Sequence, residues 1–250
     1  MSQFKLYGLI GFPLGHSFSQ QYFNTKFESE GIDAEYRNFE LPDIGDLMEL
    51  IGEYQYLSGL NVTIPYKEAV IPYMDAMDPV AKEVGAVNVI KFTRKGNDLR
   101  LTGYNTDVIG FSDSIRPLLT RDHLRALVLG SGGAAKAVAY SLWQLGVEPV
   151  IVSRTPREGV ITYADLTPEV MASHTVIVNT TPLGMYPDIE RCPDIPYDLL
   201  TPGHLCYDLL YNPDETMFMK RAARRGAKTK NGLEMLMLQA FASWDIWNAR

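Results

Sequence analysis

Short apolar runs of strand length alternate with amphipathic segments of helix length along the whole chain. This alternation predicts parallel-rich sheets covered by helices, which places the chain in the α/β class. In the first part of the chain, the periodicity predicts strands at Lys5–Ile10, Ala34–Glu40, Leu57–Thr63 and Ala86–Phe92 and helices at Ser19–Glu30, Asp43–Gly52 and Pro79–Val84. These elements are expected to form one mixed-sheet α/β domain.

A second α/β unit is predicted after a helix near Asp107–Leu119. The strand Arg125–Leu129 ends in the sequence GSGGAA, from which a helix at Ala134–Leu145 begins. The other elements predicted for the second half are strands at Pro149–Val152, Thr175–Asn179 and Leu205–Asp208, an irregular proline-rich loop at Thr181–Thr201 and a final helix at Leu233–Trp247. The architecture expected is therefore two α/β domains.

Composition narrows the class of protein. The formal net charge is −7, so the chain has no basic excess to neutralise nucleic acid or an anionic membrane. No run of about 18 apolar residues suggests a membrane span, and the N-terminus lacks the pattern of an export signal. The two cysteines, Cys192 and Cys206, fit neither a disulfide framework nor a metal-ligand motif. We expect a cytoplasmic protein that binds no nucleic acid, membrane or metal.

The glycine-rich turn is the first candidate for a ligand-binding site. Gly130, Ser131, Gly132, Gly133 and Ala134 open a G-x-G-x-x-A pattern between a predicted strand and a predicted helix. In that context, backbone N–H groups and the positive end of the helix can approach a pyrophosphate, which indicates dinucleotide binding. The alternative is a tight strand-to-helix turn whose small residues serve packing alone.

The end of the next strand bears on which dinucleotide binds. NAD sites usually have an acidic residue there for the ribose hydroxyls, whereas this chain continues with Ser153, Arg154, Thr155 and, after a proline, Arg157. Arg154 can pair with a 2′-phosphate and stack on adenine, and Arg157 can add a second cation. The segment favours NADP over NAD, although Arg157 could also be a solvated surface charge.

Small polar residues gather where strands of the first half should end. The segments are residues 15–19, 61–68 and 85–88, and residues 103–107 at the junction of the two halves. Their hydroxyls, amides, ammonium and carboxylate suit a small anionic, polyhydroxylated ligand. Each group also has a structural alternative: Ser17 and Ser19 could cap a helix, Asn88 could close a turn, Asp107 could be an N-cap, and Lys67 could be a solvated charge.

The order and spacing of these segments resemble the shikimate dehydrogenase family over nearly the whole chain. The family's Ser-x-Ser pair is matched by Ser17 and Ser19, and its N-V-T-x-P-x-K segment by residues 61–67. Residues 86–88 match its A-V-N, and residues 105–107 its N-T-D. The glycine-rich turn, residues 153–155, residues 179–181, Tyr211, Gly232 and Gln239 continue the resemblance through the second half.

The resemblance implies an oxidoreductase of the shikimate pathway, which leads to chorismate and the aromatic amino acids. Its reaction would be the reversible, NADP-dependent reduction of 3-dehydroshikimate to shikimate, and it would work as a monomer or homodimer. The substrate-binding catalytic domain would comprise residues 1–104 and 232–250, and the NADP-binding Rossmann-like domain residues 105–231. Catalysis would rest on Lys67 and Asp107.

The resemblance also assigns ligand-binding roles. Substrate would be bound by Ser17, Ser19, Asn61, Thr63, Lys67, Asn88, Asp107, Tyr211 and Gln239. The cofactor would be bound by Gly130, Ser131, Gly132, Gly133, Ala134, Ser153, Arg154, Thr155, Arg157, Asn179, Thr180, Leu209 and Gly232.

Four positions depart from the family pattern: Phe12, Gln20, Val108 and Ser153. None of them removes a catalytic group, so they bear on the shape of the substrate pocket and the strength of the NADP preference. Two alternatives keep the same fold. One is an NAD-linked quinate or shikimate dehydrogenase, and the other is a non-catalytic sensor of a shikimate-type ligand.

Overall fold

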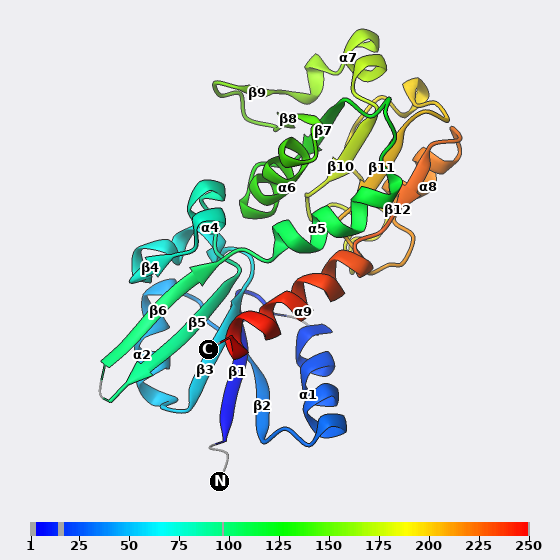
Figure 1. Ribbon diagram of the computed structural model, residues 1–250. Coiled ribbons are helices and arrows are strands. Elements are labelled where there is room, and N and C mark those ends of the chain that lie inside the picture. The colour runs from blue at the N-terminus through cyan, green and yellow to red at the C-terminus, as the bar shows by residue number, and fades with distance from the viewer. Residues whose placement is uncertain (1–3, 15–17, 97, 250) are drawn as a thin grey trace. The chain divides into compact units, whose positions relative to one another are not determined.

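The computed structural model describes residues 4–14, 18–96 and 98–249 (Figure 1). The chain folds into two compact units. Unit 1 comprises Met1–Thr106 and Ala240–Arg250, and unit 2 comprises Asp107–Gln239. The sequence-based boundaries lay after Tyr104 and before Gly232.

Local contacts explain where the units divide. Asn105 donates its side-chain amide to the carbonyl of Ala86, which holds the end of the first segment in unit 1. A Cβ built on Gly110 would lie 2.5 Å from the Met235 carbonyl oxygen. That close approach packs the segment after Gly232 against the first helix of unit 2, and the chain returns to unit 1 only at Ala240.

Unit 1 is built on a six-stranded mixed sheet. Its strands are β1 (Lys5–Gly11), β2 (Ala34–Glu40), β3 (Leu57–Val62), β4 (Ala76–Met77), β5 (Val89–Lys95) and β6 (Asp98–Tyr104), in the order β2-β1-β3-β5-β6-β4. The strands β1, β2 and β3 are mutually parallel, whereas β5 is antiparallel to both of its neighbours, β3 and β6. Its α-helices are α1 (Phe18–Glu30), α2 (Leu47–Glu53), α3 (Tyr66–Ala69), α4 (Pro79–Val84) and the last part of α9 (Leu233–Asn248).

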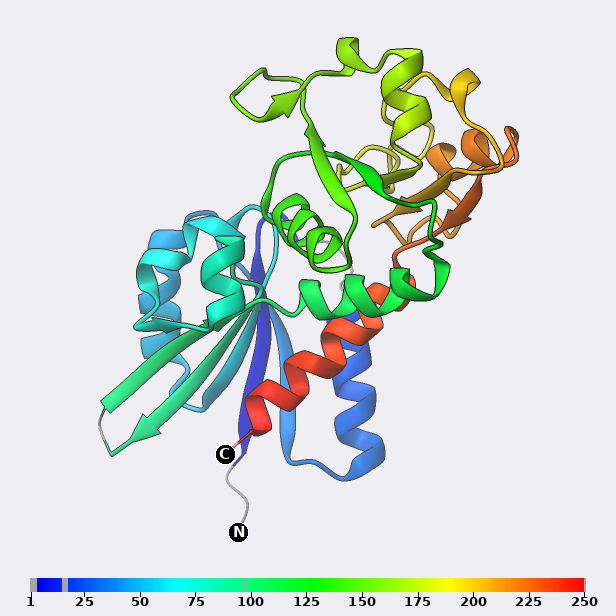
Figure 2. The same ribbon diagram turned by 45° about the horizontal axis from the view of Figure 1, so that its top comes forward.

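Both faces of this sheet are covered, and the alternation of side chains along β1 shows how. Leu6 and Ile10 point into one core with residues of α2, while Tyr7 points into the other. That second core contains Phe23 of α1 and Trp247 of α9. The ribbons of these two helices lie on the same face of the sheet in Figures 1 and 2. Unit 1 is therefore a layered α/β domain with an aromatic core on one side.

Unit 2 is built on a six-stranded, all-parallel sheet. Its strands are β7 (Arg125–Leu129), β8 (Glu148–Val152), β9 (Val160–Ile161), β10 (Val176–Asn179), β11 (Leu205–Asp208) and β12 (Lys228–Lys230), in the order β9-β8-β7-β10-β11-β12. Its helices are α5 (Asp107–Ile115), α6 (Gly133–Gln144), α7 (Pro168–Ser173), α8 (Met217–Ala223) and the first part of α9. Numbered within the unit, this is the strand order 3-2-1-4-5-6 of a doubly wound dinucleotide-binding fold, so the predicted Rossmann-type domain is confirmed.

The central strand β7 is buried on both faces. Leu127 and Leu129 pack with α7 and α8, and Ala126 and Val128 pack with α5 and α6. A strand enclosed on both sides reads as a continuous apolar run, which is why the sequence predicted its bounds correctly.

Several short elements were not predicted from the sequence. The strands β4, β9 and β12 have two or three residues, too few to show a period. The strand β6 is a full partner of β5, joined to it through a turn in which Gly96 has a φ of +61°. Helices α3, α7 and α8 each span only four to seven residues. Short 3-10 turns also occur at Ile44–Asp46, Ile71–Tyr73, Arg116–Leu118, Tyr163–Asp165 and Tyr197–Leu199. Within the described residues, no helix has both the length and the apolar character that crossing a membrane requires.

Candidate functional site

The polar segments of unit 1 lie at one edge of its sheet. Because β5 is antiparallel to β3 and to β6, β3 and β6 run in the same direction and end at the same edge. Residues 63–67 follow the end of β3, residues 105–106 follow the end of β6, and Asn88 immediately precedes β5 at that edge. Ligands of α/β sheets bind at such an edge.

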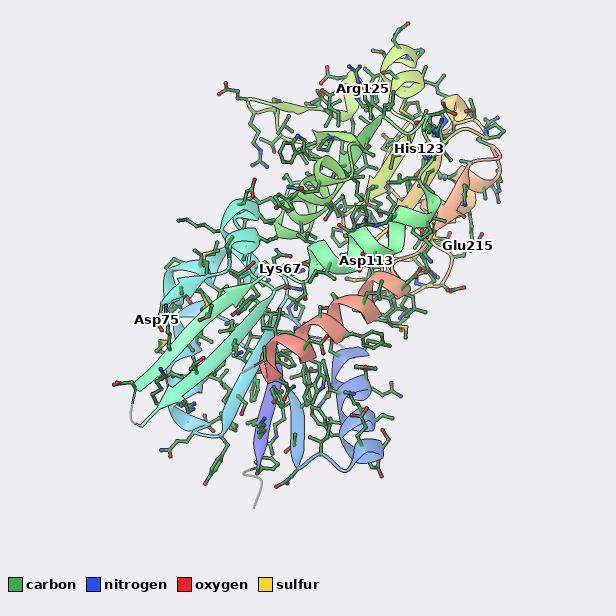
Figure 3. The ribbon with its side chains drawn as sticks, in the orientation of Figure 1. Lys67, Asp75, Asp113, His123, Arg125 and Glu215 are labelled. Carbon is green, nitrogen blue, oxygen red and sulfur yellow. The ribbon has the colours of Figure 1, made fainter. Side chains whose placement is uncertain are left out.

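Lys67 lies in the short helix α3 and is half-buried. Its carbonyl oxygen accepts a 2.7 Å hydrogen bond from the backbone N–H of Val87. That bond places Lys67 beside the segment that carries Asn88, and Figure 3 shows Lys67 at the edge where β6 ends. Thr63, four residues earlier, is also half-buried.

Three other predicted substrate residues of unit 1 are buried. The Asn88 carboxamide oxygen accepts a 2.7 Å bond from the N–H of Thr106, and its amide donates a 2.9 Å bond to the Thr106 hydroxyl. Asn88 therefore closes the turn after β6, as expected if its role were structural. This turn lies at the same edge of the sheet as the other predicted substrate residues. Asn61 and Ser19 are at most 8% exposed, whereas Ser17 lies outside the described residues.

In unit 2, Asp107 is the first residue of α5 and is buried. It follows Thr106 directly, so the peptide bond holds the two Cα atoms about 3.8 Å apart. Gln239, predicted to contact substrate, lies on α9; a Cβ on Gly110 would be 3.1 Å from its Cβ. Gly110 thus lets α9 approach within one turn of Asp107. Tyr211 follows β11 and is half-buried.

The glycine-rich turn joins β7 to α6 at the point where the strand order reverses. Gly130 has a φ of +117°, and a Cβ there would lie 2.5 Å from the hydroxyl oxygen of Thr180. Gly132 is the N-cap of α6 and has no side chain to accept from the first-turn N–H groups. These groups therefore face outward for an anion, as a pyrophosphate cradle requires.

The arginine segment reaches this turn. The guanidinium of Arg157 donates a 2.6 Å hydrogen bond to the hydroxyl of Ser131. Arg154, Thr155 and Arg157 are exposed after the end of β8, and the N–H of Thr155 donates to the Ser153 hydroxyl at 3.4 Å. Arg157 is thus a neighbour of the predicted pyrophosphate cradle, where a cation can meet a phosphate.

The side chain of Asn179 is fully buried. Its carboxamide oxygen accepts bonds from the backbone and hydroxyl of Thr181, at 3.0 and 2.7 Å. Its amide donates a 3.0 Å bond to the carboxylate of Asp208. The side chain therefore holds the loop after β10 in place, while the backbone and hydroxyl of Thr180 bond to the Leu129 carbonyl.

Asp208 was not singled out in the sequence. This fully buried carboxylate also accepts bonds from the N–H of Leu210 and, at 2.6 Å, from the hydroxyl of Thr216. Burial raises the pKa of Asp208 to about 6, against a smaller lowering by these hydrogen bonds. The sequence could have pointed to Asp208, because it is an acidic residue at the end of an otherwise apolar strand. No sequence pattern pointed to its partner Thr216.

The backbone crosses itself closely at Gly232 and Leu209. A Cβ on Gly232 would lie 2.0 Å from the carbonyl oxygen of Leu209, so only glycine fits at this crossing. The N–H of Gly232 donates to the Leu210 carbonyl, and the N–H of Leu209 donates to the Asn179 carbonyl. The loop that follows β11 is thereby held between β10 and the start of α9.

The two units thus present different chemistry. Unit 1 offers an ammonium and buried amides and hydroxyls, and unit 2 offers a phosphate-type cradle with exposed arginines. Among the residues that the structure describes, no group of three or more His, Cys, Asp or Glu side chains could hold a metal ion. The role of each residue predicted from the sequence stays a prediction.

Known proteins resemble this chain along nearly its whole length. The family described as "Shikimate dehydrogenase substrate binding domain" matches residues 9–90. The chain is 39% identical to "Shikimate dehydrogenase (NADP(+))" of Moorella thermoacetica, over 98% of this chain and 88% of that protein. The crystal structure of shikimate dehydrogenase from Aquifex aeolicus superposes with a TM-score of 0.86 at 36% identity, covering 99% of this chain and 94% of that one. Shikimate 5-dehydrogenase from Thermus thermophilus, solved in complex with NADP(H) and shikimate, gives a TM-score of 0.84 at 30% identity, covering 98% and 93%.

Proposed function

The chain belongs to the shikimate dehydrogenase family, and from this premise we propose that it catalyses the reversible, NADP-dependent reduction of 3-dehydroshikimate to shikimate. The observation that carries this proposal is the similarity to NADP-dependent shikimate dehydrogenases over nearly the full chain. The reaction belongs to the shikimate pathway of aromatic amino acid biosynthesis.

The residues of unit 2 fit NADP. The uncapped N-terminus of α6 and the side-chain-free Gly132 leave N–H groups for the pyrophosphate. Arg154 and Arg157 suit the 2′-phosphate, and the bond from Arg157 to Ser131 supports this role because it brings a cation to the same turn. Ser153, Thr155, Thr180, Leu209 and Gly232 complete the proposed cofactor site, and Asn179 acts by shaping its loop.

Substrate binding is assigned mainly to the polar edge of unit 1. Ser17 and Ser19 hold the carboxylate, and Asn61, Thr63 and Asn88 bond the hydroxyl groups. Asp107, Tyr211 and Gln239, from unit 2, complete the set. Amides and hydroxyls suit a polyhydroxylated acid because each can donate or accept as the substrate requires.

Lys67 is the proposed acid and base. When bound, NADPH supplies the hydride that reduces the C3 ketone of the substrate. The Lys67 ammonium donates the proton to the C3 oxygen, and in the oxidising direction its neutral amine takes the proton back. Asp107 accepts a hydrogen bond from a substrate hydroxyl and completes the catalytic pair.

We also propose that the enzyme acts in the cytoplasm on small molecules, as a monomer or homodimer. Both cysteines, Cys192 and Cys206, are free thiols, and burial raises the pKa of Cys206 to about 12, so this thiol stays protonated. Fractionation and sedimentation of the native protein check these two assignments.

The experiment that tests the function follows absorbance of reduced nicotinamide as shikimate is added to the enzyme with NADP+. A rise with NADP+ that exceeds the rise with NAD+ is expected, and quinate in place of shikimate is the matched substrate control. Better turnover with NAD+ and quinate would contradict the assignment. Thermal stabilisation by shikimate without any absorbance change with either cofactor would contradict catalysis and indicate a sensor.

A further inference from the structure

A continuous chain of hydrogen bonds runs through the interior of unit 1. The hydroxyl of Tyr36 donates to the carboxamide oxygen of Asn61 at 2.8 Å. The Asn61 amide donates to the hydroxyl of Ser243 at 3.1 Å. The Ser243 hydroxyl lies 3.2 Å from that of Thr106, which is in turn bonded to Asn88. Five segments of the chain therefore meet through side chains.

The chain extends to a third predicted substrate residue. Burial raises the pKa of Tyr36, and the side chain of Ser19 on α1 opposes this with a smaller lowering, which places Ser19 next to the Tyr36 hydroxyl. Three of the six members, Ser19, Asn61 and Asn88, are proposed to bind substrate. The other three, Tyr36, Thr106 and Ser243, have no role assigned so far. Tyr36 lies between Ser19 and Asn61 in the chain, and Ser243 and Thr106 lie between Asn61 and Asn88.

All six side chains are buried, with at most 8% of any of them exposed. A buried polar group is tolerated only when it is hydrogen-bonded, because burial removes its bonds to water. Among the described residues, removing the Tyr36 hydroxyl would leave the Asn61 carboxamide oxygen without a side-chain donor, which costs more than the bond contributes. Removing the Ser243 hydroxyl would leave the Asn61 amide with a longer, 3.4 Å bond to the Asn88 carbonyl. The arrangement is therefore held tightly.

The direction of the bonds orients the Asn61 carboxamide. Burial raises the pKa of Tyr36, so its phenol stays protonated and donates to Asn61. The carboxamide oxygen faces Tyr36, and the amide faces Ser243. Among the described residues, Tyr36 is the one side chain that donates to that oxygen, so a second lone pair is left for a ligand hydroxyl.

We propose that Tyr36 and Ser243 are positioning residues for substrate: their hydroxyls fix the carboxamide of Asn61 and, through Thr106, that of Asn88. A ligand hydroxyl then meets amide groups that need no reorientation on binding, which lowers the cost of forming the complex. This inference rests on the proposed function, because it takes shikimate as the ligand of Asn61 and Asn88.

The first test is Ser243→Ala, compared with Ser114→Ala. Ser114 is a buried helical serine of unit 2 whose hydroxyl lies 2.8 Å from that of Tyr207, so its variant also loses a buried serine–hydroxyl bond. We expect Ser243→Ala to raise the KM for shikimate about five- to tenfold, the factor that one hydrogen bond typically contributes. The KM for NADP+ should stay within about twofold, and Ser114→Ala should leave both values near those of the wild type.

The second test is Tyr36→Phe, compared with Tyr7→Phe. Both tyrosines are fully buried and pack against Trp247, but the Tyr7 hydroxyl has no hydrogen-bond partner among the described residues. Losing the Tyr36 hydroxyl should raise the KM for shikimate by a similar factor, whereas losing the Tyr7 hydroxyl should not. Melting temperatures of all four variants separate loss of stability from loss of substrate binding.

The outcomes distinguish this inference from the proposed function. Wild-type turnover with shikimate, combined with an unchanged shikimate KM in both Ser243→Ala and Tyr36→Phe, would overturn the positioning role and leave the function standing. Equal effects in the test and control variants would show a structural role only, which also overturns it. A wild-type protein that neither oxidises nor binds shikimate would contradict the proposed function itself.

Discussion

The carboxylate of Asp208 accepts a 3.0 Å hydrogen bond from the side-chain amide of Asn179, and neither residue is exposed. The two residues end adjacent parallel strands, β11 and β10, and are register partners. Through this bond, a buried charge at one strand end fixes the loop that follows the other.

Stability should depend on pH through Asp208. Burial raises its pKa from 3.8 to about 6, so the folded protein binds this proton more tightly than the unfolded chain does. The contribution of Asp208 to stability is therefore complete below about pH 4 and is lost as pH rises through about 6. Because Asp208→Asn cannot titrate, the variant's free energy of unfolding relative to wild type should increase between pH 4 and 7, by up to roughly 3 kcal/mol. Urea denaturation across this range measures the difference.

The control for that experiment is Asp188→Asn, which changes an exposed carboxylate in the same unit. The difference from wild type should change more with pH for Asp208→Asn than for Asp188→Asn, because only Asp208 is buried. A difference for Asp208→Asn that does not change with pH would mean that Asp208 does not titrate in this window.

Lys67→Ala should lower kcat by about 10²–10⁴-fold, because a positioned proton donor typically accelerates the reaction by that factor. Affinity for NADP+ should change little, since the proposed cofactor residues belong to unit 2. Steady-state kinetics and cofactor titration measure the two quantities. Lys82→Ala, which removes an exposed lysine of α4, is the matched control and should behave as wild type. Near-native turnover of Lys67→Ala would remove Lys67 from the mechanism.

Replacing Arg154 or Arg157 by alanine should weaken NADP+ selectively. A charge-assisted pair contributes roughly 1.5–3 kcal/mol, so the KM for NADP+ should rise by tens- to hundreds-fold while that for NAD+ is nearly unchanged. Arg125→Ala is the control, because Arg125 begins β7 at the opposite edge of the sheet from the glycine-rich turn. Equal losses for both cofactors would argue against 2′-phosphate recognition by these arginines.

Gly232→Ala should destabilise the protein because the new Cβ would lie 2.0 Å from backbone oxygen of Leu209. Overpacking of this kind typically costs about 1–3 kcal/mol, and the shifted Leu209 loop should also raise the KM for NADP+. Gly52→Ala provides the comparison. It lies in α2 with nothing within 4 Å of a Cβ, so its melting temperature should be unchanged or higher. A melting temperature for Gly232→Ala equal to that of wild type would show that the crossing can widen.

Elements with local signals could be predicted from the amino-acid sequence. The strand β7 is enclosed on both faces and is therefore a continuous apolar run, and the glycines after it mark the start of α6 because a turn at Gly130 needs a positive φ. The segments around Lys67, Asn88 and Asp107 were recognisable because their order and spacing can be read from the sequence without knowing how the chain packs. Fold class, family and the proposed chemistry follow from such signals.

The residues that hold other side chains in place could be identified only from the three-dimensional fold. Ser243 meets Asn61 from 182 positions away, and no local pattern marks a serine on an apolar helix for that contact. No local pattern marked Thr216 as the partner of Asp208 either, because a buried hydrogen bond depends on which surfaces the fold brings together. The short strand β12 forms because β11 offers an edge to pair with, not because Lys228–Lys230 has a strong intrinsic preference for a strand. Pairings of this kind are properties of three-dimensional packing, so they are absent from the periodicity of the chain.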